Sequence, residues 1–292
     1  MSDDTDASGL DALGSASIPG GKNVLIAGPA MTGKRRLLYE VAEVVEVVGR
    51  LLGHRPGAVA REHKPPAGTG GFVTPRGERA RMLVAFDFDG TLSDSEMTVL
   101  LGERCGVADE MAAITERAMN DEIGYAESLR ERCRLLDGLA DDETRLAFEA
   151  VRLRSGAADV LSALDAAGAF TAILTGGFER GVAAALDREG ATADEVVANR
   201  LPVADGALTG AVEGPLVEGT KDDALEALAA REGVPMAETV AVGDGANDLP
   251  MLEVAGLAVG YDPKPAVEPA CDVVVESMAD LRTVLEDEGV LA

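Results

Sequence analysis

The stretch LVAFDFDGTLSDSE (residues 83–96) decides the fold of this chain. Its four apolar residues run directly into Asp87 and Asp89, which are separated by one residue and are followed by Gly-Thr. A short apolar run of this kind is typical of a buried strand in a parallel sheet. Because ligands of open α/β sheets bind beyond the carboxyl ends of the strands, we expect both carboxylates to face a site there.

The remainder of 82–292 alternates between strand-like runs and helical patterns, which predicts an α/β fold: a doubly wound, Rossmann-like parallel sheet with helices on both faces. The strand-like runs are 83–87, 170–174, 194–199, 239–243, 256–260 and 272–275, and the helical patterns are 157–168, 178–189, 221–232, 246–255 and 277–287. Residues 94–152 are helical throughout and too long for a single crossover, so they predict an inserted helical cap. Two short runs on either side of Asp205-Gly206 predict a small β-hairpin flap.

The composition excludes several classes of protein. The 292 residues are 47% hydrophobic but only 3% aromatic, so the core must consist mainly of Ala, Val and Leu. No apolar run approaches the ~20 residues of a membrane span, and the N-terminus has no secretory pattern, so we expect no membrane partner. Cys105, Cys133 and Cys271 are scattered singly, which favours a reducing, cytoplasmic location.

The charge of the chain is large and uneven. Residues 1–81 hold 11 Lys+Arg and 9 Asp+Glu, a net of +2, whereas residues 82–292 hold 15 and 43, a net of −28. Only five of the 26 basic residues are Lys. Such a surface suits molar salt, where the Debye length is ~3 Å and self-repulsion is screened. The charge predicts a halophilic protein and argues against a nucleic-acid partner. An acidic face for a basic partner is the alternative, which is disfavoured because the acidic residues are spread along the whole of 82–292.

Three further segments carry chemistry. AILTGG (172–177) ends the second strand with Thr175 and Gly176, a hydroxyl and a backbone N–H suited to an anion. EGTKDDAL (218–225) places Lys221 in the first turn of a helix. VAVGDGANDLPML (240–252) supplies Asp244, Asn247 and Asp248. A carboxylate nucleophile, an acid–base group, oxygen ligands for Mg²⁺, a hydroxyl and an ammonium together are what phosphoryl transfer requires.

In this order the segments resemble the haloacid dehalogenase-like phosphatase superfamily, whose motifs are DxDG(T), Ser/Thr, Lys and GDxxxD. The resemblance covers 82–292. It implies that Asp87 is the nucleophile, that Asp89 is the general acid and base, and that Mg²⁺ is held by Asp87, the Asp89 backbone carbonyl and Asp244. It also implies that Asp248 orders the surroundings of the metal or of the lysine. The phosphate-binding residues that it implies are Thr175, Gly176, Lys221 and Asn247.

Within the superfamily the chain is most similar to the phosphoserine phosphatase family, on the acidic residue after DFDGTLSDS, the cap segment YAESLRERCRLLDGL (125–139) and the flap. The resemblance implies Mg²⁺-dependent hydrolysis of O-phosphoserine, a small-molecule substrate, through an aspartyl-phosphate. Glu96 would then meet the serine ammonium and Arg132 its carboxylate, by a bidentate fork. Met119 and Tyr125 would be apolar cap contacts. Three alternatives stay open: another small-molecule phosphatase, Arg130 in place of Arg132, and Glu96 as a plain helix N-terminal acid.

The first 81 residues read as an N-terminal extension: a polar tail, a P-loop-like strand and helix, and a linker rich in Gly, Pro and Arg. Gly28 to Lys34 have the G-x-x-x-x-G-K spacing, but Arg35 stands where Ser or Thr should ligate Mg²⁺. The extension is interpreted as a fused remnant or as an upstream stretch not made in the cell. A phosphatase regulated by nucleotide at this segment is the alternative function. The expected domains are a core of 82–93 and 153–292 and a cap of 94–152; the sequence does not reveal the oligomeric state.

Overall fold

The computed structural model describes residues 82–120, 122–218 and 221–291. The P-loop-like segment and the rest of 1–81 therefore lie outside the described residues. Within the described ranges, no helix is both long enough and apolar enough to cross a membrane.

A six-stranded sheet, in the order β3-β2-β1-β6-β7-β8, forms the centre of the fold, and every neighbouring pair is parallel. Its strands are β1 (Leu83–Phe86), β2 (Phe170–Phe178), β3 (Glu195–Asn199), β6 (Thr239–Gly243), β7 (Leu257–Tyr261) and β8 (Val273–Val275). The chain builds the sheet outward from β1 on one side and from β6 on the other. The topological switch point, where such sheets bind ligands, thus lies between β1 and β6.

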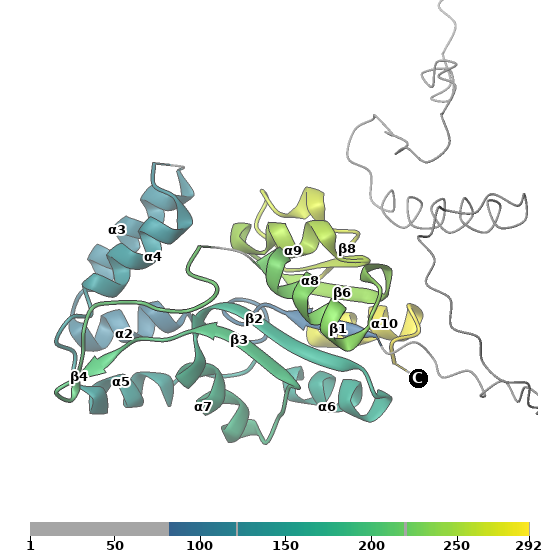
Figure 1. The fold of residues 1–292 in the computed structure, drawn as a ribbon, viewed down its shortest axis with the longest axis horizontal. Helices are drawn as coiled ribbons and strands as arrows, with labels where there is room; N and C mark the ends of the chain where they lie inside the picture. The colour runs from purple at the N-terminus through teal and green to yellow at the C-terminus, as the bar shows by residue number, and fades with distance from the viewer. Residues whose placement is uncertain (1–81, 121, 219–220, 292) are drawn as a thin grey trace, which may run out of the picture. The chain divides into compact units, whose positions relative to one another are not determined.

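Helices cover both faces of this sheet, as Figure 1 shows. They are α6 (Ala157–Ala167), α7 (Glu179–Glu189), α8 (Lys221–Glu232), α9 (Leu249–Val254) and α10 (Met278–Asp287). The central strand β1 is buried on both sides because its residues alternate between two apolar clusters. Val84 and Phe86 pack with residues of α6, α7 and α10, whereas Leu83 and Ala85 pack with residues of α8 and α9. Burial of each large apolar side chain stabilises the fold by about 1.5–3 kcal/mol.

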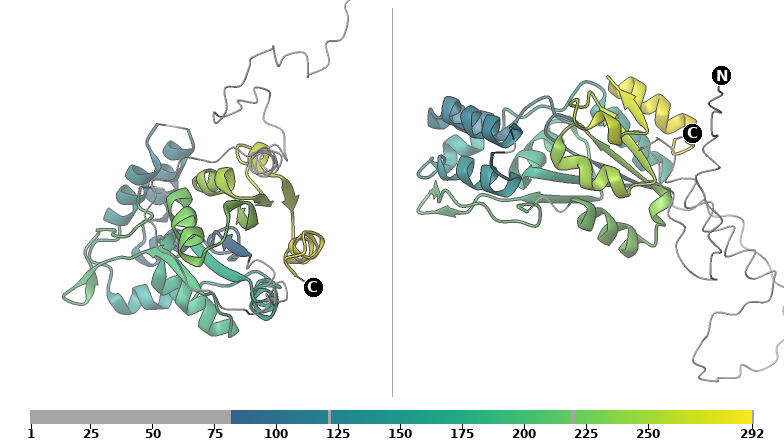
Figure 2. Two further views of the ribbon diagram at one scale, coloured as in Figure 1. Left: turned by 45° about the vertical axis from the view of Figure 1, so that its right-hand side comes forward. Right: turned by 90° about the horizontal axis from the view of Figure 1, so that it is seen from above.

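Four further helices lie between β1 and β2 in the sequence and form the inserted cap. They are α2 (Met97–Cys105), α3 (Ala108–Met119), α4 (Tyr125–Arg134) and α5 (Asp141–Phe148). Figures 1 and 2 show them grouped together at one end of the sheet. Met97 and Leu101 of α2 join the same apolar cluster as Phe86, so the cap and the sheet share a core.

The predicted flap is a two-stranded hairpin of β4 (Val203–Ala204) and β5 (Ala207–Leu208). Asp205 and Gly206 both have positive φ, 51° and 79°, as a tight hairpin turn of type I′ requires. Leu208 exchanges backbone hydrogen bonds with the cap, donating to the Leu139 carbonyl at 2.8 Å and accepting from the Gly138 N–H at 2.9 Å. These findings confirm the predicted fold class: a doubly wound parallel sheet, a helical cap and a flap.

Two elements differ from the sequence prediction. Strand β2 continues to Phe178 rather than ending at Leu174, because its pairing with β3 resumes at Phe178 and Asn199 after a register shift. The TGG segment is therefore an irregularity within a strand. Irregularities of this kind, such as β-bulges, change the direction in which the local groups point. The predicted helix over 246–255 is divided into a 3₁₀ turn, η2 (Ala246–Asp248), and α9. Two more 3₁₀ turns are η1 (Met236–Glu238) and η3 (Glu268–Ala270).

Candidate active site

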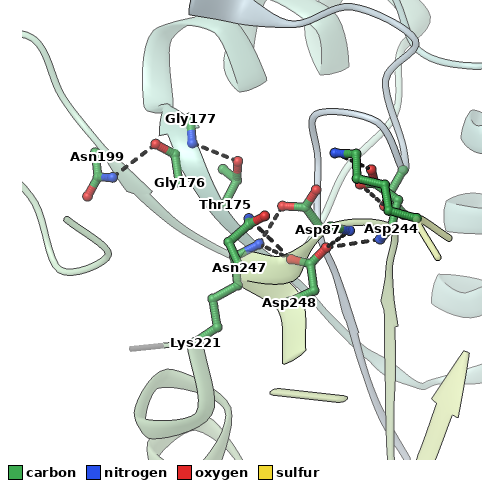
Figure 3. Close-up of polar contacts among 12 residues, drawn as sticks. Asp87, Thr175, Gly176, Gly177, Asn199, Lys221, Asp244, Asn247 and Asp248 are labelled. Carbon is green, nitrogen blue, oxygen red and sulfur yellow. Dashed lines mark hydrogen bonds and ion pairs between the residues drawn. The ribbon is translucent and has the colours of Figure 1, made fainter. Parts of the chain in front are cut away.

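Asp87 lies directly after β1, at the switch point of the sheet. Its backbone N–H donates to the Val242 carbonyl of β6 at 2.8 Å, so the strand pairing fixes the main chain from which the side chain projects. Lys221 is the first residue of α8, and its Nζ lies 2.5 Å from Asp87 Oδ1 and 2.6 Å from Asp248 Oδ1 (Figure 3). All three side chains are buried. Residues separated by more than 130 positions thus form one ionic cluster.

Asp248 accepts four hydrogen bonds. Its Oδ1 accepts from Lys221 and, at 3.4 Å, from the Asn247 amide, and its Oδ2 accepts from the backbone N–H groups of Asp244 and Gly245, both at 2.9 Å. A carboxylate offers about four acceptor positions, and here all four are occupied. We infer that Asp248 holds the lysine and the loop in place rather than binding a metal directly.

Asp244 follows β6, and the DxDGT loop contacts its carboxylate. Thr91 Oγ1 donates to Asp244 Oδ1 at 3.3 Å. Gly90 has a φ of +90°, and a Cβ there would lie 2.7 Å from Asp244 Oδ1. Only glycine therefore allows the loop to pass so close to this carboxylate.

The charges of this cluster suit a divalent cation. Carboxylate oxygens of Asp87, Asp244 and Asp248 lie within 4.8 Å of one another. Burial foremost, and then repulsion by Asp248, raise the pKa of Asp87 to about 8, even though Lys221 opposes the change. Burial and Asp248 also raise the pKa of Asp244. Since all four acceptor positions of Asp248 are taken by hydrogen bonds, Asp87 and Asp244 are the carboxylates that could hold a hard cation. The charge of such a cation would lower the pKa of both.

Asp89 is in a different environment from Asp87. Its Oδ1 is buried and has no hydrogen-bond partner among the described residues. Burial, followed by repulsion from Glu96 and Asp87, raises the pKa of Asp89 well above its usual value. Two aspartates separated by one residue thus differ in surroundings: Asp87 is paired with an ammonium, whereas burial and neighbouring carboxylates shift the pKa of Asp89 in the direction that favours a proton donor.

Thr175 and Gly176 lie in β2, beside β1, and form the opposite wall. The Gly177 N–H donates to Thr175 Oγ1 at 2.9 Å, which leaves the hydroxyl proton of Thr175 for another acceptor. The Asn199 amide donates to the Gly176 carbonyl at 3.0 Å, and its Oδ1 accepts from the Leu216 N–H at 3.0 Å (Figure 3). Asn199 therefore ties the β2 irregularity to the segment that leads toward Lys221.

The order of these groups along the chain matches a known family of hydrolases. The family model described as haloacid dehalogenase-like hydrolase matches residues 84–253, which contain every site residue described above. The chain belongs to the haloacid dehalogenase-like hydrolases.

Individual relatives of this hydrolase support the same assignment. It is 57% identical to a phosphoserine phosphatase of Halobacterium salinarum over 208 residues, which are 71% of this chain and 99% of the relative. It is 37% identical to a phosphoserine phosphatase of Methanocaldococcus jannaschii over 72% of this chain and 98% of the relative. A solved substrate-bound phosphoserine phosphatase complex, 36% identical, superposes with a TM-score of 0.67 and covers 72% of this chain and 99% of its own.

Arg130 and Arg132, the two candidate arginines in the cap, have different surroundings. Arg130 forms an ion pair with Glu218, and both side chains are exposed. Arg132 is half-buried: its Nη1 donates to Thr98 Oγ1 at 3.2 Å and its Nε to the Ser128 carbonyl at 3.4 Å. Among the described residues, Arg132 has no carboxylate partner. Of the two, Arg132 is therefore the one whose charge is available to a ligand.

Glu96 is the residue that precedes α2, but its side chain makes no capping hydrogen bond to that helix. Its carboxylate is exposed and close enough to Asp89 to raise the pKa of Asp89. Its position at the N-terminus of α2 still fits the alternative of a helix N-terminal acid favoured by the helix dipole. The described residues make no hydrogen bond or ion pair with its carboxylate, and its charge acts on both Asp89 and Lys264.

The two apolar cap residues named from the sequence behave differently. The Tyr125 hydroxyl sits directly on Gly176, since a Cβ at Gly176 would lie 1.8 Å from it. Burial raises the pKa of Tyr125 to about 12, so the hydroxyl remains a hydrogen-bond donor at neutral pH. Met119, in contrast, is 72% exposed at the end of α3.

Three polar residues at the site were missed by the sequence reasoning: Thr91, Asn199 and Lys264. Thr91 follows the DxDG residues directly and could have been recognised there. Asn199 gave no sequence signal other than its place at the end of a strand. Lys264, whose Nζ lies 3.3 Å from Asp244 Oδ2, is one of only two lysines after residue 81, so a count of lysines would have singled it out.

Proposed function

We propose that this hydrolase is a phosphoserine phosphatase, which converts O-phospho-L-serine and water to L-serine and phosphate, the last step of serine biosynthesis. The observation that carries the proposal is the 57% identity to the Halobacterium phosphoserine phosphatase over 99% of that protein. The carboxylate of Glu96, exposed near Asp89, and the guanidinium of Arg132, which has no carboxylate partner among the described residues, would complement an ammonium and a carboxylate.

Mg²⁺ is the proposed cofactor. The carboxylates of Asp87 and Asp244 and the backbone carbonyl of Asp89 would hold it, and oxygen ligands of this kind are those that Mg²⁺ prefers. When bound, the ion supplies positive charge between the nucleophile and the phosphate. The acidic cluster and the raised pKa values of Asp87 and Asp244 support a cation at this position.

Asp87 is the proposed nucleophile and Asp89 the proposed general acid and base. A carboxylate oxygen of Asp87 attacks phosphorus in line, and the bond between phosphorus and the serine oxygen breaks. Asp89, whose pKa is raised by its burial, gives a proton to the departing oxygen. Water then attacks the aspartyl-phosphate, Asp89 takes a proton from that water, and phosphate is released together with the Asp87 carboxylate.

The remaining site residues would stabilise the charge of the transferring group. Lys221 is a buried ammonium: although burial disfavours its charge, Asp248 and Asp87 raise its pKa above the usual value. Thr175 can donate its hydroxyl proton to a phosphate oxygen, and Gly176 its N–H. Asn247, next to Asp248, can contact phosphate or order water. Preorganised donors of this kind stabilise transition-state charge strongly in a site that excludes water.

The setting of the enzyme also belongs to this proposal. The net charge of −28 on residues 82–292 and the close Halobacterium relative support a halophilic enzyme. Cys105, Cys133 and Cys271 are free thiols, as expected in a reducing cytoplasm. We further propose that 82–93 and 153–292 form the catalytic core and 94–152 the cap.

A substrate panel tests the proposal. Phosphate release would be measured in molar KCl with Mg²⁺ for O-phospho-L-serine, O-phosphoethanolamine, which lacks the carboxylate, and p-nitrophenyl phosphate. We expect kcat/KM for phosphoserine to exceed that for phosphoethanolamine by about tenfold or more, because a charge-assisted hydrogen bond contributes about 1.5–3 kcal/mol. Equal values for the two would reject the substrate assignment and favour a less selective small-molecule phosphatase.

A further inference from the structure

Lysine is rare in this chain, and the two lysines after residue 81 both lie at the acidic cluster. Residues 82–292 contain 13 Arg and two Lys, Lys221 and Lys264. Lys221 is part of the site described above. The ammonium of Lys264 lies 3.3 Å from Asp244 Oδ2, so the second lysine faces the same group of carboxylates.

The chain after β7 holds Lys264 against Asp244. Asp262 turns the chain with a positive φ of 41°, and the Lys264 N–H donates to the Asp244 carbonyl at 2.9 Å. The main chain of Lys264 is therefore fixed beside the proposed metal ligand. Its side chain is 55% exposed, whereas that of Asp244 is only 12% exposed, so the ammonium can leave while the carboxylate stays.

Asp244 does not depend on Lys264 for its orientation. Thr91 donates to its Oδ1, and the tight approach of Gly90 confines the same carboxylate from another side. Without a metal, Asp244 needs a nearby positive charge, because the carboxylates of Asp87 and Asp248 lie within 4.8 Å and repel it. Lys264 supplies that charge at the oxygen that Thr91 does not contact.

We propose that Lys264 is the built-in counter-ion of the metal-free site, and that a divalent cation displaces its ammonium from Asp244 on binding. The proposal rests on the metal site proposed above. Lys264 would stabilise the metal-free protein by offsetting repulsion among the carboxylates, and it would lower the affinity for Mg²⁺ because the metal must compete with it. Once displaced, the ammonium can turn to solvent, since its side chain is 55% exposed.

Titration calorimetry of the full chain with MgCl₂, without substrate and in molar KCl, tests this proposal. We expect Lys264→Gln to bind Mg²⁺ about tenfold more tightly than wild type, which corresponds to about 1.4 kcal/mol. Arg282→Gln is the matched control, because it makes the same change in net charge on α10, where Arg282 pairs with Glu286. It should leave the Mg²⁺ affinity unchanged. Lys264→Arg, which keeps the positive charge, should bind Mg²⁺ nearly as wild type does.

Thermal unfolding in EDTA provides a readout independent of the metal. Lys264→Gln should unfold at a temperature several degrees lower than Arg282→Gln, since of these two residues only Lys264 contacts a carboxylate of the acidic cluster. Equal or weaker Mg²⁺ binding by Lys264→Gln would overturn the proposal and show that Lys264 orients Asp244 for the metal. If wild type bound no Mg²⁺ at all, the metal assignment would fall and this proposal with it, whereas phosphatase activity would be judged separately by the substrate panel.

Discussion

Replacement of Asp248 by Asn is the perturbation whose effect on stability follows most directly from the structure. Oδ1 of Asp248 accepts from Lys221 and Asn247, and Oδ2 accepts from the N–H groups of Asp244 and Gly245. An Asn side chain has one acceptor oxygen and one NH₂ group. Whichever way the amide turns, its NH₂ faces two donors, so no rotamer restores the four hydrogen bonds.

The magnitude follows from the burial of this ion pair. Lys221 remains buried with one carboxylate, Asp87, in place of two. Removal of one partner from a buried ion pair destabilises a protein by about 3–5 kcal/mol. For a domain of this size, 1 kcal/mol shifts the melting temperature by about 2–4 °C. We therefore expect Asp248→Asn to melt roughly 6–20 °C below wild type.

Thermal unfolding followed by circular dichroism, in EDTA and molar KCl, measures this difference without a contribution from the metal. Glu286→Gln removes the same charge from an exposed pair with Arg282 and is the matched control. It should change the free energy of unfolding by no more than about 0.5 kcal/mol. A loss for Asp248→Asn as small as that of the control would refute the inference that Asp248 holds Lys221 in place.

Three other predictions concern the nucleophile, the pH dependence and the surface. Asp87→Asn should abolish turnover while the protein stays folded, and a beryllium fluoride adduct located on any residue other than Asp87 would reject the assignment. Burial and Asp248 raise the pKa of Asp87 to about 8, above its unfolded value of 3.8. Between these two values the folded protein binds more protons than the unfolded chain, so the metal-free protein should lose stability as the pH rises from about 4 to 8. For the same reason, Mg²⁺ binding at pH 7 should release a proton. Calorimetry in buffers of different ionisation enthalpy measures that proton; no release would contradict the raised pKa. Finally, activity and cooperative unfolding should decline when KCl falls from molar to about 0.1 M, where the Debye length grows to ~10 Å; undiminished stability there would show that the acidity has another cause.

Local patterns predicted most of the fold. The expected strand over 239–243 coincides with β6, and the expected helix over 221–232 coincides with α8. In both segments the spacing of the apolar residues is enough to identify the element, without any contact from elsewhere in the chain. The end of β2 could not be predicted in this way, because Gly176 and Gly177 read as a turn and only the renewed pairing with β3 keeps them in the strand.

The site could be predicted where its residues end strands or begin helices, since topology alone brings Asp87, Asp244 and Lys221 to one edge. Contacts between side chains that lie far apart in the sequence could not be predicted. The choice between Arg130 and Arg132 depends on Glu218, 88 positions from Arg130, and no local pattern indicates that pairing.

The central claim, that the site selects an amino-acid phosphate, is tested most directly by the substrate preference of Arg132→Ala. The measurement is kcat/KM for O-phospho-L-serine and for p-nitrophenyl phosphate, with Arg130→Ala as the control. We expect Arg132→Ala to lose about 10- to 100-fold on phosphoserine, since a charge-assisted hydrogen bond contributes about 1.5–3 kcal/mol, and to change little on the ester that has no carboxylate. Arg130→Ala, which breaks only an exposed ion pair, should leave the ratio of the two values at that of wild type. Equal losses on both substrates for Arg132→Ala would contradict the account.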